Sequence, residues 1–434
     1  MEDEILKNAR LELEELKQIS SYFKLDNFAL YMKIKRTELL IQCGNIKNID
    51  QELRKLEKNI RKEIFKTNIS EKYKSPNKKE IWKKSTKFEY ERALYPTLLE
   101  KKIKDSILFS PQILVVFHSC MSAIDAILKV ILALFTKKDK IYIISLAYYF
   151  ETISLFKIFY NIKGIKLDIL DKILDFYNLL ENNSVADVFF VEGMDVNLKE
   201  DSLDVKYINS IIRKRKSNKP VIIIIDTTLI NSNFNVHEIF YKLNINLIIF
   251  VVRSGLKLEQ QGLELANIGI VEIYTNDSKL PLEKIKNILI TARTLCGTSI
   301  SHTEEKMLLS DLFFCSKTLD YISKIEKNAE RIYTAIRDTK RKELNLVCYK
   351  EHAPFLLLYL IESNLESCIN FISRLRKYLN SRKTDVNIGT SFGFRHLRIE
   401  IIKHVSYNCI IRISPGVYWG NDCKYLVDFL NLCE

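Results

Sequence analysis

The sequence lacks any close cysteine pair and any cysteine and histidine cluster with the spacing of a zinc site. Its nine cysteines form no C-x-x-C motif, and its six histidines are scattered along the chain. We therefore expect no metal site. We also expect the cysteines to be reduced thiols of a cytoplasmic protein.

Long hydrophobic runs are also missing. The apolar stretches "VIIII" (221–225) and "INLIIFVV" (245–252) are far shorter than the ~20 residues of a membrane-spanning helix. The first residues, "MEDEILKNAR", are acidic and lack the apolar core of a secretory signal. No membrane partner is expected.

The composition that is present indicates a globular protein of more than one domain, with 434 residues of which 47% are hydrophobic. A formal charge of +13 could indicate a nucleic-acid partner, but no recognised binding motif accompanies it, and the excess of Lys, Ile and Asn suggests a compositional origin. We expect no nucleic acid. Binding through the basic surface stays an alternative, and it would require steep salt dependence on a polyanion.

Three regions follow from the pattern of the chain. Residues 1–85 form a predicted helical N-terminal extension, because leucines recur at helical spacing in "ILKNARLELEELKQI", and its end, "SEKYKSPNKKEIWKKS", resembles a basic linker. In residues 86–300 short aliphatic segments alternate with amphipathic ones, which predicts a large α/β domain with a parallel sheet covered on both faces. Residues 301–434 have longer helical segments and then strand-like ones, typical of a small α+β domain.

Polar residues at the predicted strand ends are the candidates for chemistry, because ligands of parallel sheets bind beyond the carboxyl ends of the strands. Ser119, Asp226 and Lys257 each follow an aliphatic run, and Lys257 comes 31 residues after Asp226. Taken singly, Asp226 is typical of a turn or helix cap and Lys257 of a solvated loop. Taken together, they are what pyridoxal phosphate needs: a carboxylate that keeps the ring nitrogen protonated and a lysine that binds the aldehyde as a Schiff base.

The sequence from about residue 88 resembles the fold type I pyridoxal-phosphate enzymes, most closely the cysteine and methionine metabolism (cystathionine γ-synthase-like) family. "YERALYPTLLE" is similar to the family's Y-x-R-x-x-N-P-T motif, which implies that Tyr90 and Arg92 reach the cofactor phosphate of a neighbouring subunit. "HSCMSAIDA" resembles S-S-G-M-A-A-I, which implies that Ser119, Cys120 and Met121 hold the same phosphate at a helix N-terminus.

Four further motifs follow in the family's order. "YFETISLF" implies that Tyr149 stacks on the pyridine ring, and "IIDTT" gives Asp226 the ring-nitrogen role. "SGLK" resembles S-A-T-K, which implies a phosphate contact for Ser254 and the Schiff base for Lys257. "IRISPG" resembles V-R-L-S-V-G, whose arginine clamps the substrate α-carboxylate, and "SFGF" resembles S-L-G-G. These two motifs imply Arg412 and Ser391 as substrate-binding residues, with Arg395 and Arg398 as rival carboxylate binders.

The sequence departs from the family pattern at several lining positions. Cys120 replaces a glycine of the phosphate loop, and Phe150 and Glu151 replace the two glycines after the stacking tyrosine. Thr227 and Leu256 replace an asparagine and a threonine. These changes suggest an unusual amino-acid substrate in a specialised biosynthetic pathway.

The resemblance implies a homodimeric or homotetrameric enzyme that carries out β- or γ-elimination or replacement on a substituted amino acid. In that reaction Lys257 would be the general base, and Tyr149 would assist proton transfer. The alternative is a catalytically silent scaffold or partner-binding regulator with the same fold.

Overall fold

A computed structural model describes residues 2–72, 95–135, 140–162, 164–182, 185–215, 219–230, 234–338, 342–403 and 409–432. The chain divides into two compact units. We call the first the terminal unit; it consists of Met1–Ser75, Lys257–Leu265 and Ser310–Glu434. The second, the sheet unit, consists of Pro76–Leu256 and Ala266–Leu309. Each is described separately.

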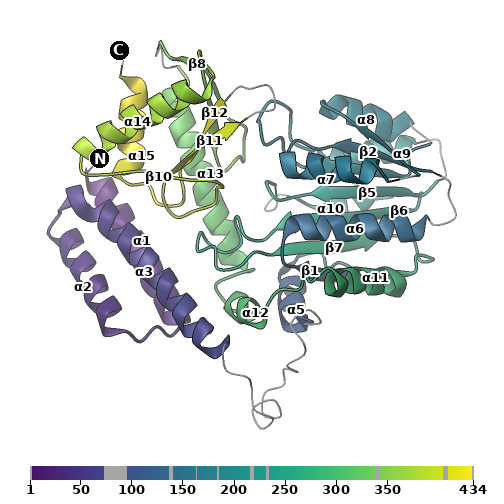
Figure 1. Ribbon diagram of the computed structural model, residues 1–434, viewed down its shortest axis with the longest axis horizontal. Helices are drawn as coiled ribbons and strands as arrows, with labels where there is room; N and C mark the ends of the chain where they lie inside the picture. The colour runs from purple at the N-terminus through teal and green to yellow at the C-terminus, as the bar shows by residue number, and fades with distance from the viewer. Residues whose placement is uncertain are drawn as a thin grey trace, which may run out of the picture. The chain divides into compact units, whose positions relative to one another are not determined.

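The sheet unit is built on a seven-stranded sheet of order β1-β7-β6-β5-β4-β2-β3 (Figure 1). All neighbouring pairs are parallel except those of β7, which runs antiparallel to both β1 and β6. The strands are β1 (Ile113–Phe117), β2 (Ile141–Leu146), β3 (Ile165–Ile169), β4 (Val188–Glu192), β5 (Val221–Asp226), β6 (Leu247–Ser254) and β7 (Gly269–Thr275).

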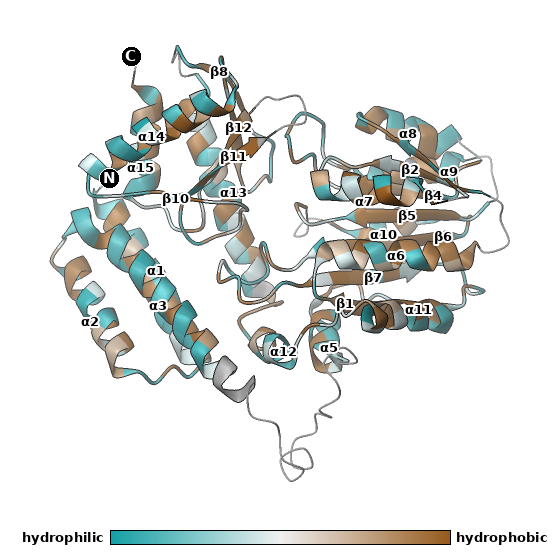
Figure 2. Ribbon diagram, in the orientation of Figure 1, coloured by the Kyte–Doolittle hydropathy of each residue, from teal (hydrophilic) through white to brown (hydrophobic). Residues whose placement is uncertain are grey.

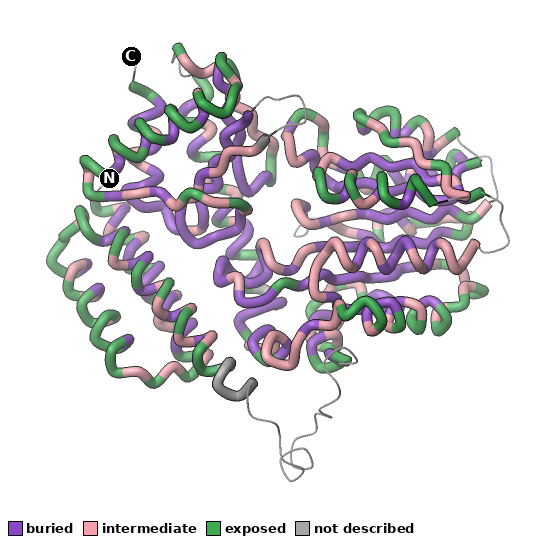
Figure 3. Tube along the Cα trace, viewed as in Figure 1, coloured by how far each residue is buried: buried purple, intermediate pink, exposed green. Residues whose placement is uncertain are grey.

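Both faces of this sheet are covered by helices, as predicted. Alternate residues of one strand enter different cores: Ile222 and Ile224 join one hydrophobic cluster, and Ile223 and Ile225 join the other. Full burial of each such side chain contributes about 1.5–3 kcal/mol. With the exception of β3 at one edge of the sheet, the strands are accordingly hydrophobic and largely buried (Figures 2 and 3). The first cluster includes residues of α6 (Cys120–Leu134), α7 (Phe150–Tyr160) and α11 (Leu282–Leu295), and the second includes residues of α8 (Ile173–Asn182), α9 (Val205–Lys214) and α10 (Val236–Phe240).

Two more helices of this unit are α5 (Thr97–Ser106) and α12 (His302–Leu308). Glu100 of α5 accepts hydrogen bonds from the amide of Val116 in β1 (3.1 Å) and from Arg293 of α11 (2.7 Å). Arg293 is buried and also donates to the carbonyl of Val116 (2.9 Å). Glu100 and Arg293 thereby attach α5 and α11 to the edge strand β1.

The terminal unit contains a five-stranded sheet of order β10-β11-β12-β9-β8. Only the β10 and β11 pair is parallel among the described residues. The strands are β8 (Leu344–Cys348), β9 (Leu356–Leu360), β10 (Asn387–Ile388), β11 (Arg398–Lys403) and β12 (Cys409–Ser414), and the helices that pack with them are α13 (Ser316–Ile336), α14 (Leu365–Ser381) and α15 (Asn421–Asn431).

The same unit includes the N-terminal helices α1 (Glu2–Tyr22), α2 (Phe28–Gln42) and α3 (Ile46–Lys72). Leu13, Leu16 and Ile19 lie on the buried side of α1, in agreement with the predicted helical spacing. The side chain of Asn27 caps α2 by accepting from the amide of Ala29 (2.9 Å). Among the helices that the structure describes, none combines the length and the apolar character that crossing a membrane demands.

The helical stretch expected after residue 300 is interrupted between α12 and α13. Phe314 has a left-handed backbone conformation, with φ of 53°, which ends helical continuity. Thr318 then accepts a hydrogen bond from the amide of Cys315 (3.5 Å) at the start of α13. Periodicity alone did not reveal this break, because apolar residues such as Leu312 and Phe313 continue between the two helices.

Candidate active site

In the sheet unit, several polar residues lie at the carboxyl ends of strands that run in the same direction. Glu192 ends β4 directly beside Asp226 at the end of β5, and Ser254 ends β6. Gly269 at the start of β7 is paired with both Ser254 and Phe117, the residue that ends β1. The structure therefore brings the predicted Ser119, Asp226 and Ser254 to one edge of the sheet.

The predicted phosphate loop forms the start of α6. The hydroxyl of Ser119 accepts from the amide of Ser122 (3.1 Å), and the Ser119 amide donates to the Ser122 hydroxyl (3.1 Å). The amides of Cys120 and Met121 lie in the first turn, where a helix offers no internal partner. Gly269 packs against this loop so closely that a Cβ there would overlap the Ser119 carbonyl. The arrangement can hold an anion.

The carboxylate of Asp226 contacts Thr228 and Cys120. Its Oδ1 accepts from the amide of Thr228 (2.9 Å), and its Oδ2 lies 3.8 Å from the sulfur of Cys120. Desolvation raises the pKa of Asp226, and the pKa of the Cys120 thiol is raised by burial first and by the charge of Asp226 second. Cys120 is thus a neutral thiol that donates to Asp226.

The environment of Asp226 fits a cationic ring. None of the described lysines or arginines forms an ion pair with it, and the hydrogen-bond donors that lower its pKa are Thr228 and Cys120. A desolvated carboxylate is stabilised by a positive charge beside it. A protonated pyridine nitrogen would supply that charge.

Glu192 is a functional candidate that the sequence reasoning missed. Its carboxylate accepts from the backbone amides of Tyr148 (3.0 Å) and Tyr149 (2.9 Å). Burial, and next the negative charge of Asp226, raise the pKa of Glu192 to about 8. The rule that selected Asp226, a charged residue at the end of an aliphatic strand, also points to Glu192.

Tyr149 lies just before α7, with its backbone position fixed by Glu192. Its side chain is half-buried, and its ring centroid is 5.0 Å from that of Phe150 at an interplanar angle of 60°. The bulky aromatic neighbour stands where the related motif has glycine. Tyr149 thus belongs to the same sheet edge as Asp226.

Lys257 belongs to the terminal unit and is held by a specific contact rather than exposed on a loop. Its Nζ donates to the hydroxyl of Ser391 (2.8 Å) and lies 5.5 Å from the ring centroid of Phe392. Ser391 has φ of 81°, a left-handed conformation that non-glycine residues rarely adopt. Gly393 also has positive φ, and a Cβ on it would overlap the Lys257 carbonyl. The structure brings Lys257 and Ser391 together, and the cofactor and substrate roles that the motifs imply for them stay predictions.

Arg412 joins this group through Glu400, which the sequence reasoning also missed. The two residues face each other across β11 and β12, and their side chains form an ion pair. Glu400 also accepts from the amide of Ser391 (3.3 Å). Lys257, Ser391, Glu400 and Arg412 thus form one connected cluster, which we call the lysine cluster.

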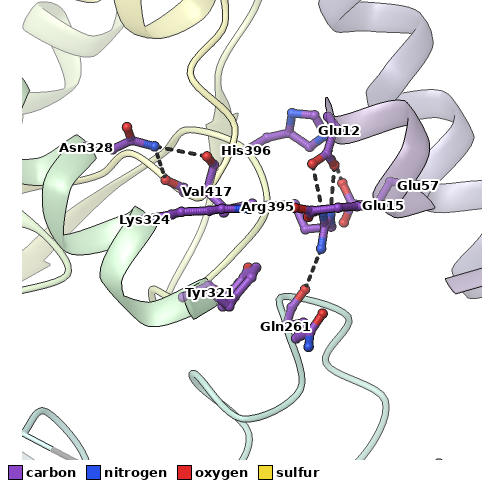
Figure 4. A network of polar contacts seen from close by, with 12 residues as sticks. Glu12, Glu15, Glu57, Gln261, Tyr321, Lys324, Asn328, Arg395, His396 and Val417 are labelled. Atoms are coloured by element: carbon purple, nitrogen blue, oxygen red, sulfur yellow. Dashed lines mark hydrogen bonds and ion pairs between the residues drawn. The ribbon is translucent and has the colours of Figure 1, made fainter. Parts of the chain in front are cut away.

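The rival residues have other partners. Arg395 is buried and donates to Glu12 and Glu15 of α1 and to the carbonyl of Gln261 (Figure 4). Arg398 donates to the carbonyl of Thr390 (2.8 Å) and lies over the Phe394 ring. Arg395 is therefore a structural residue. The remaining two candidates, Tyr90 and Arg92, lie outside the described residues.

Comparison with known proteins also indicates a pyridoxal-phosphate-dependent enzyme. Residues 48–248 match the sequence profile of the family described as Cys/Met metabolism PLP-dependent enzyme. No curated protein sequence matches the chain.

Solved structures with the same fold are similar at low identity. A cystathionine γ-synthase from Xanthomonas oryzae pv. oryzae in complex with cystathionine is 14% identical with a TM-score of 0.59, and 80% of this chain and 90% of that chain are covered. A methionine γ-lyase from Micromonospora echinospora is 15% identical (TM-score 0.56; 79% and 86% covered). Yeast cystathionine γ-lyase is 15% identical (TM-score 0.56; 80% and 89%).

Asp226 ends β5 of the sheet unit, and Lys257 donates to Ser391 in the terminal unit; the cofactor roles that the motifs imply for Asp226 and Lys257 stay predictions. Pyridoxal phosphate is the cofactor of the family. Over residues 48–248 the chain is thus similar to the Cys/Met metabolism PLP-dependent enzymes, and it shares the fold of solved cystathionine γ-synthase and γ-lyase structures.

Proposed function

We propose that Lys257 binds the aldehyde of pyridoxal phosphate and that Asp226 holds its ring nitrogen. The observation that carries this proposal is the desolvated carboxylate of Asp226, which has no lysine or arginine ion-pair partner among the described residues. The cofactor supplies an electron sink for negative charge that develops on the substrate carbon. Asp226 stabilises the cationic ring that makes this possible.

Anion binding at the sheet edge supports the remaining cofactor contacts. The first-turn amides of Cys120 and Met121, and the hydroxyls of Ser119 and Ser254, are proposed to bind the phosphate. In this proposal Tyr90 and Arg92 of a neighbouring subunit complete the phosphate site, so the protein acts as a homodimer or homotetramer. Tyr149 is proposed to stack on the ring.

In this proposal the lysine cluster and Tyr149 carry out proton transfer. The Nζ of Lys257, oriented by the hydroxyl of Ser391, takes the proton from the carbon next to the reacting amine. We propose that Tyr149 then assists proton transfer while a β or γ substituent leaves or is replaced. The substrate is a substituted amino acid of a specialised biosynthetic pathway, which we place in the cytoplasm.

The experiment that tests this function is a spectroscopic titration of the purified protein with pyridoxal phosphate. We expect a visible absorbance band that is lost in Lys257→Ala and retained in Lys172→Ala, a matched change at an exposed lysine of the sheet unit. A protein that neither binds the cofactor nor develops the band would instead be the catalytically silent scaffold.

A further inference from the structure

The segment that begins at Lys257 has an unusual backbone conformation. We call this segment, Lys257–Leu265, the 257–265 loop; it belongs to the terminal unit. Gln261 and Glu264 have φ angles of 50° and 43°, a left-handed conformation that residues other than glycine rarely adopt. Such a conformation persists only where the surrounding structure holds it. The path of the 257–265 loop therefore depends on contacts from outside the loop.

An arginine holds each of these two left-handed residues by its backbone carbonyl. Arg395 donates to the carbonyl of Gln261 (3.2 Å). Arg61 of α3 donates to the carbonyl of Glu264 (3.0 Å). Because the donors are charged, these hydrogen bonds are stronger than those between neutral groups. The N-terminal helices thus hold the loop at two points, since Arg395 is itself bound to Glu12 of α1.

Arg61 is in a less buried setting than Arg395. Arg395 is fully buried among its ion-pair partners, so its removal has a large effect on the whole unit. Arg61 is half-buried on α3, and the central carbon of its guanidinium lies 5.7 Å from the ring centroid of Phe65, one turn later. A change at Arg61 should therefore affect the 257–265 loop more selectively than a change at Arg395.

The side chain of Glu264 relates the end of the loop to its beginning. Burial raises the pKa of Glu264. The positive charges of Arg398, Arg61 and Lys257 act on this pKa in the opposite direction. The carboxyl group of Glu264 therefore lies in the electrostatic field of the Lys257 amine. A shift of Glu264 away from Arg61 would change both the backbone path of the loop and the charge near Lys257.

The contacts of Arg61 give the N-terminal extension a link to the cofactor site. Building on the function proposed above for Lys257, we propose that Arg61 is a positioning residue: it holds the Glu264 carbonyl and thereby places the Lys257 amine for the cofactor. The hydroxyl of Ser391 orients the amine itself (2.8 Å), and Arg61 fixes the backbone that carries it. The extension then contributes to cofactor binding as well as to stability.

Hydrogen exchange of the cofactor-free protein tests whether Arg61 holds the loop. In Arg61→Gln the backbone amides of the 257–265 loop should exchange at least tenfold faster than in wild type, while those of β11 and β12 keep their rates. Glutamine is a good helix former, so α3 should persist. Arg36→Gln is the matched control, because Arg36 lies on α2 of the same unit with a side chain that is 71% exposed. Its exchange should match that of wild type.

Spectroscopic titration with pyridoxal phosphate tests whether the loop places Lys257. Arg61→Gln should bind the cofactor at least tenfold more weakly than wild type and Arg36→Gln. Arg61→Lys keeps a charged donor and should recover part of this affinity.

The inference is overturned if Arg61→Gln binds the cofactor as tightly as wild type, or if its loop amides exchange no faster. Faster exchange throughout the terminal unit, or failure of Arg61→Gln to fold, would also overturn it, because Arg61 would then be a general structural residue. Failure of the proposed function gives a different result, since the wild-type protein itself would then develop no absorbance band.

Discussion

Arg395 makes a two-point ion pair with Glu12, a residue 383 positions earlier in the chain. Its Nε and one terminal nitrogen each lie 2.7 Å from a Glu12 oxygen. Arg395 also pairs with Glu15 and donates to the carbonyl of Gln261 in the segment that follows Lys257 (Figure 4). Arg395 thus links the N-terminal helix α1 to the segment that contains Lys257.

This relationship predicts a large loss of stability in Arg395→Leu. The change leaves the buried Glu12 without its cation, which should cost about 3–5 kcal/mol. Urea denaturation measures the free energy of unfolding. Arg374→Ala, which breaks an exposed ion pair in the same unit, should cost at most about 1 kcal/mol. Similar losses in both variants would show that burial of the Arg395 pair is unimportant.

Removal of residues 1–72 should unfold the terminal unit. A second buried network supports this prediction: Arg54 of α3 pairs with Asp422, and Asp50 accepts from Tyr418 (2.9 Å). Deletion would leave Asp422 and Tyr418 without these partners and would expose the surface that the N-terminal helices cover. Circular dichroism and limited proteolysis of the truncated chain provide the measurement. A soluble, protease-resistant product would instead favour a detachable partner-binding arm.

The pH dependence of the free energy of unfolding should reveal the raised pKa of Glu192. Its pKa is raised from the ordinary value of 4.5 to about 8, so the folded protein binds its proton more tightly than the unfolded chain does. The contribution of Glu192 to the free energy of unfolding is therefore most favourable below pH 4.5, and this contribution is lost as the pH rises to about 8. In the cofactor-free protein, Glu192→Gln should become more stable relative to wild type by up to a few kcal/mol between pH 5 and 8. Denaturation of both proteins at several pH values tests this difference, and a constant difference would contradict it.

The close approach of Gly269 to the phosphate loop can be tested with a single methyl group. In Gly269→Ala the Cβ would overlap the Ser119 carbonyl and crowd the Cys120 amide, so the loop must move. We expect at least tenfold weaker binding of pyridoxal phosphate. Gly389→Ala, where a Cβ meets only one side-chain atom at 3.9 Å, should bind normally. Equal affinity in both variants would argue against phosphate binding by this loop.

Much of the fold could be predicted from the sequence because fully buried parallel strands are continuous aliphatic runs. Strand β7 was missed because Glu272 interrupts its apolar pattern. The structure shows why this charge is tolerated: Glu272 forms a buried ion pair with Arg253 of β6. Such a pair depends on strand register, which a single segment does not reveal.

Contacts that depend on strand register or on tertiary packing were also missed in the candidate active site. Asp226 and Lys257 became candidates because strand ends and family motifs mark them directly, and their roles stay predictions. Glu400 was missed because its ion pair with Arg412 depends on their lying opposite each other in an antiparallel strand pair. Arg395 was a candidate for substrate binding, and only the packing of α1 shows that Glu12 and Glu15 occupy it.

The most direct test of the account identifies the residue that binds the cofactor. The protein is incubated with pyridoxal phosphate, reduced with borohydride and digested, and the labelled peptide is sequenced by mass spectrometry. We expect a pyridoxyl group on Lys257 in wild type and no label at that position in Lys257→Ala. A label on another lysine, or none, would contradict the central claim.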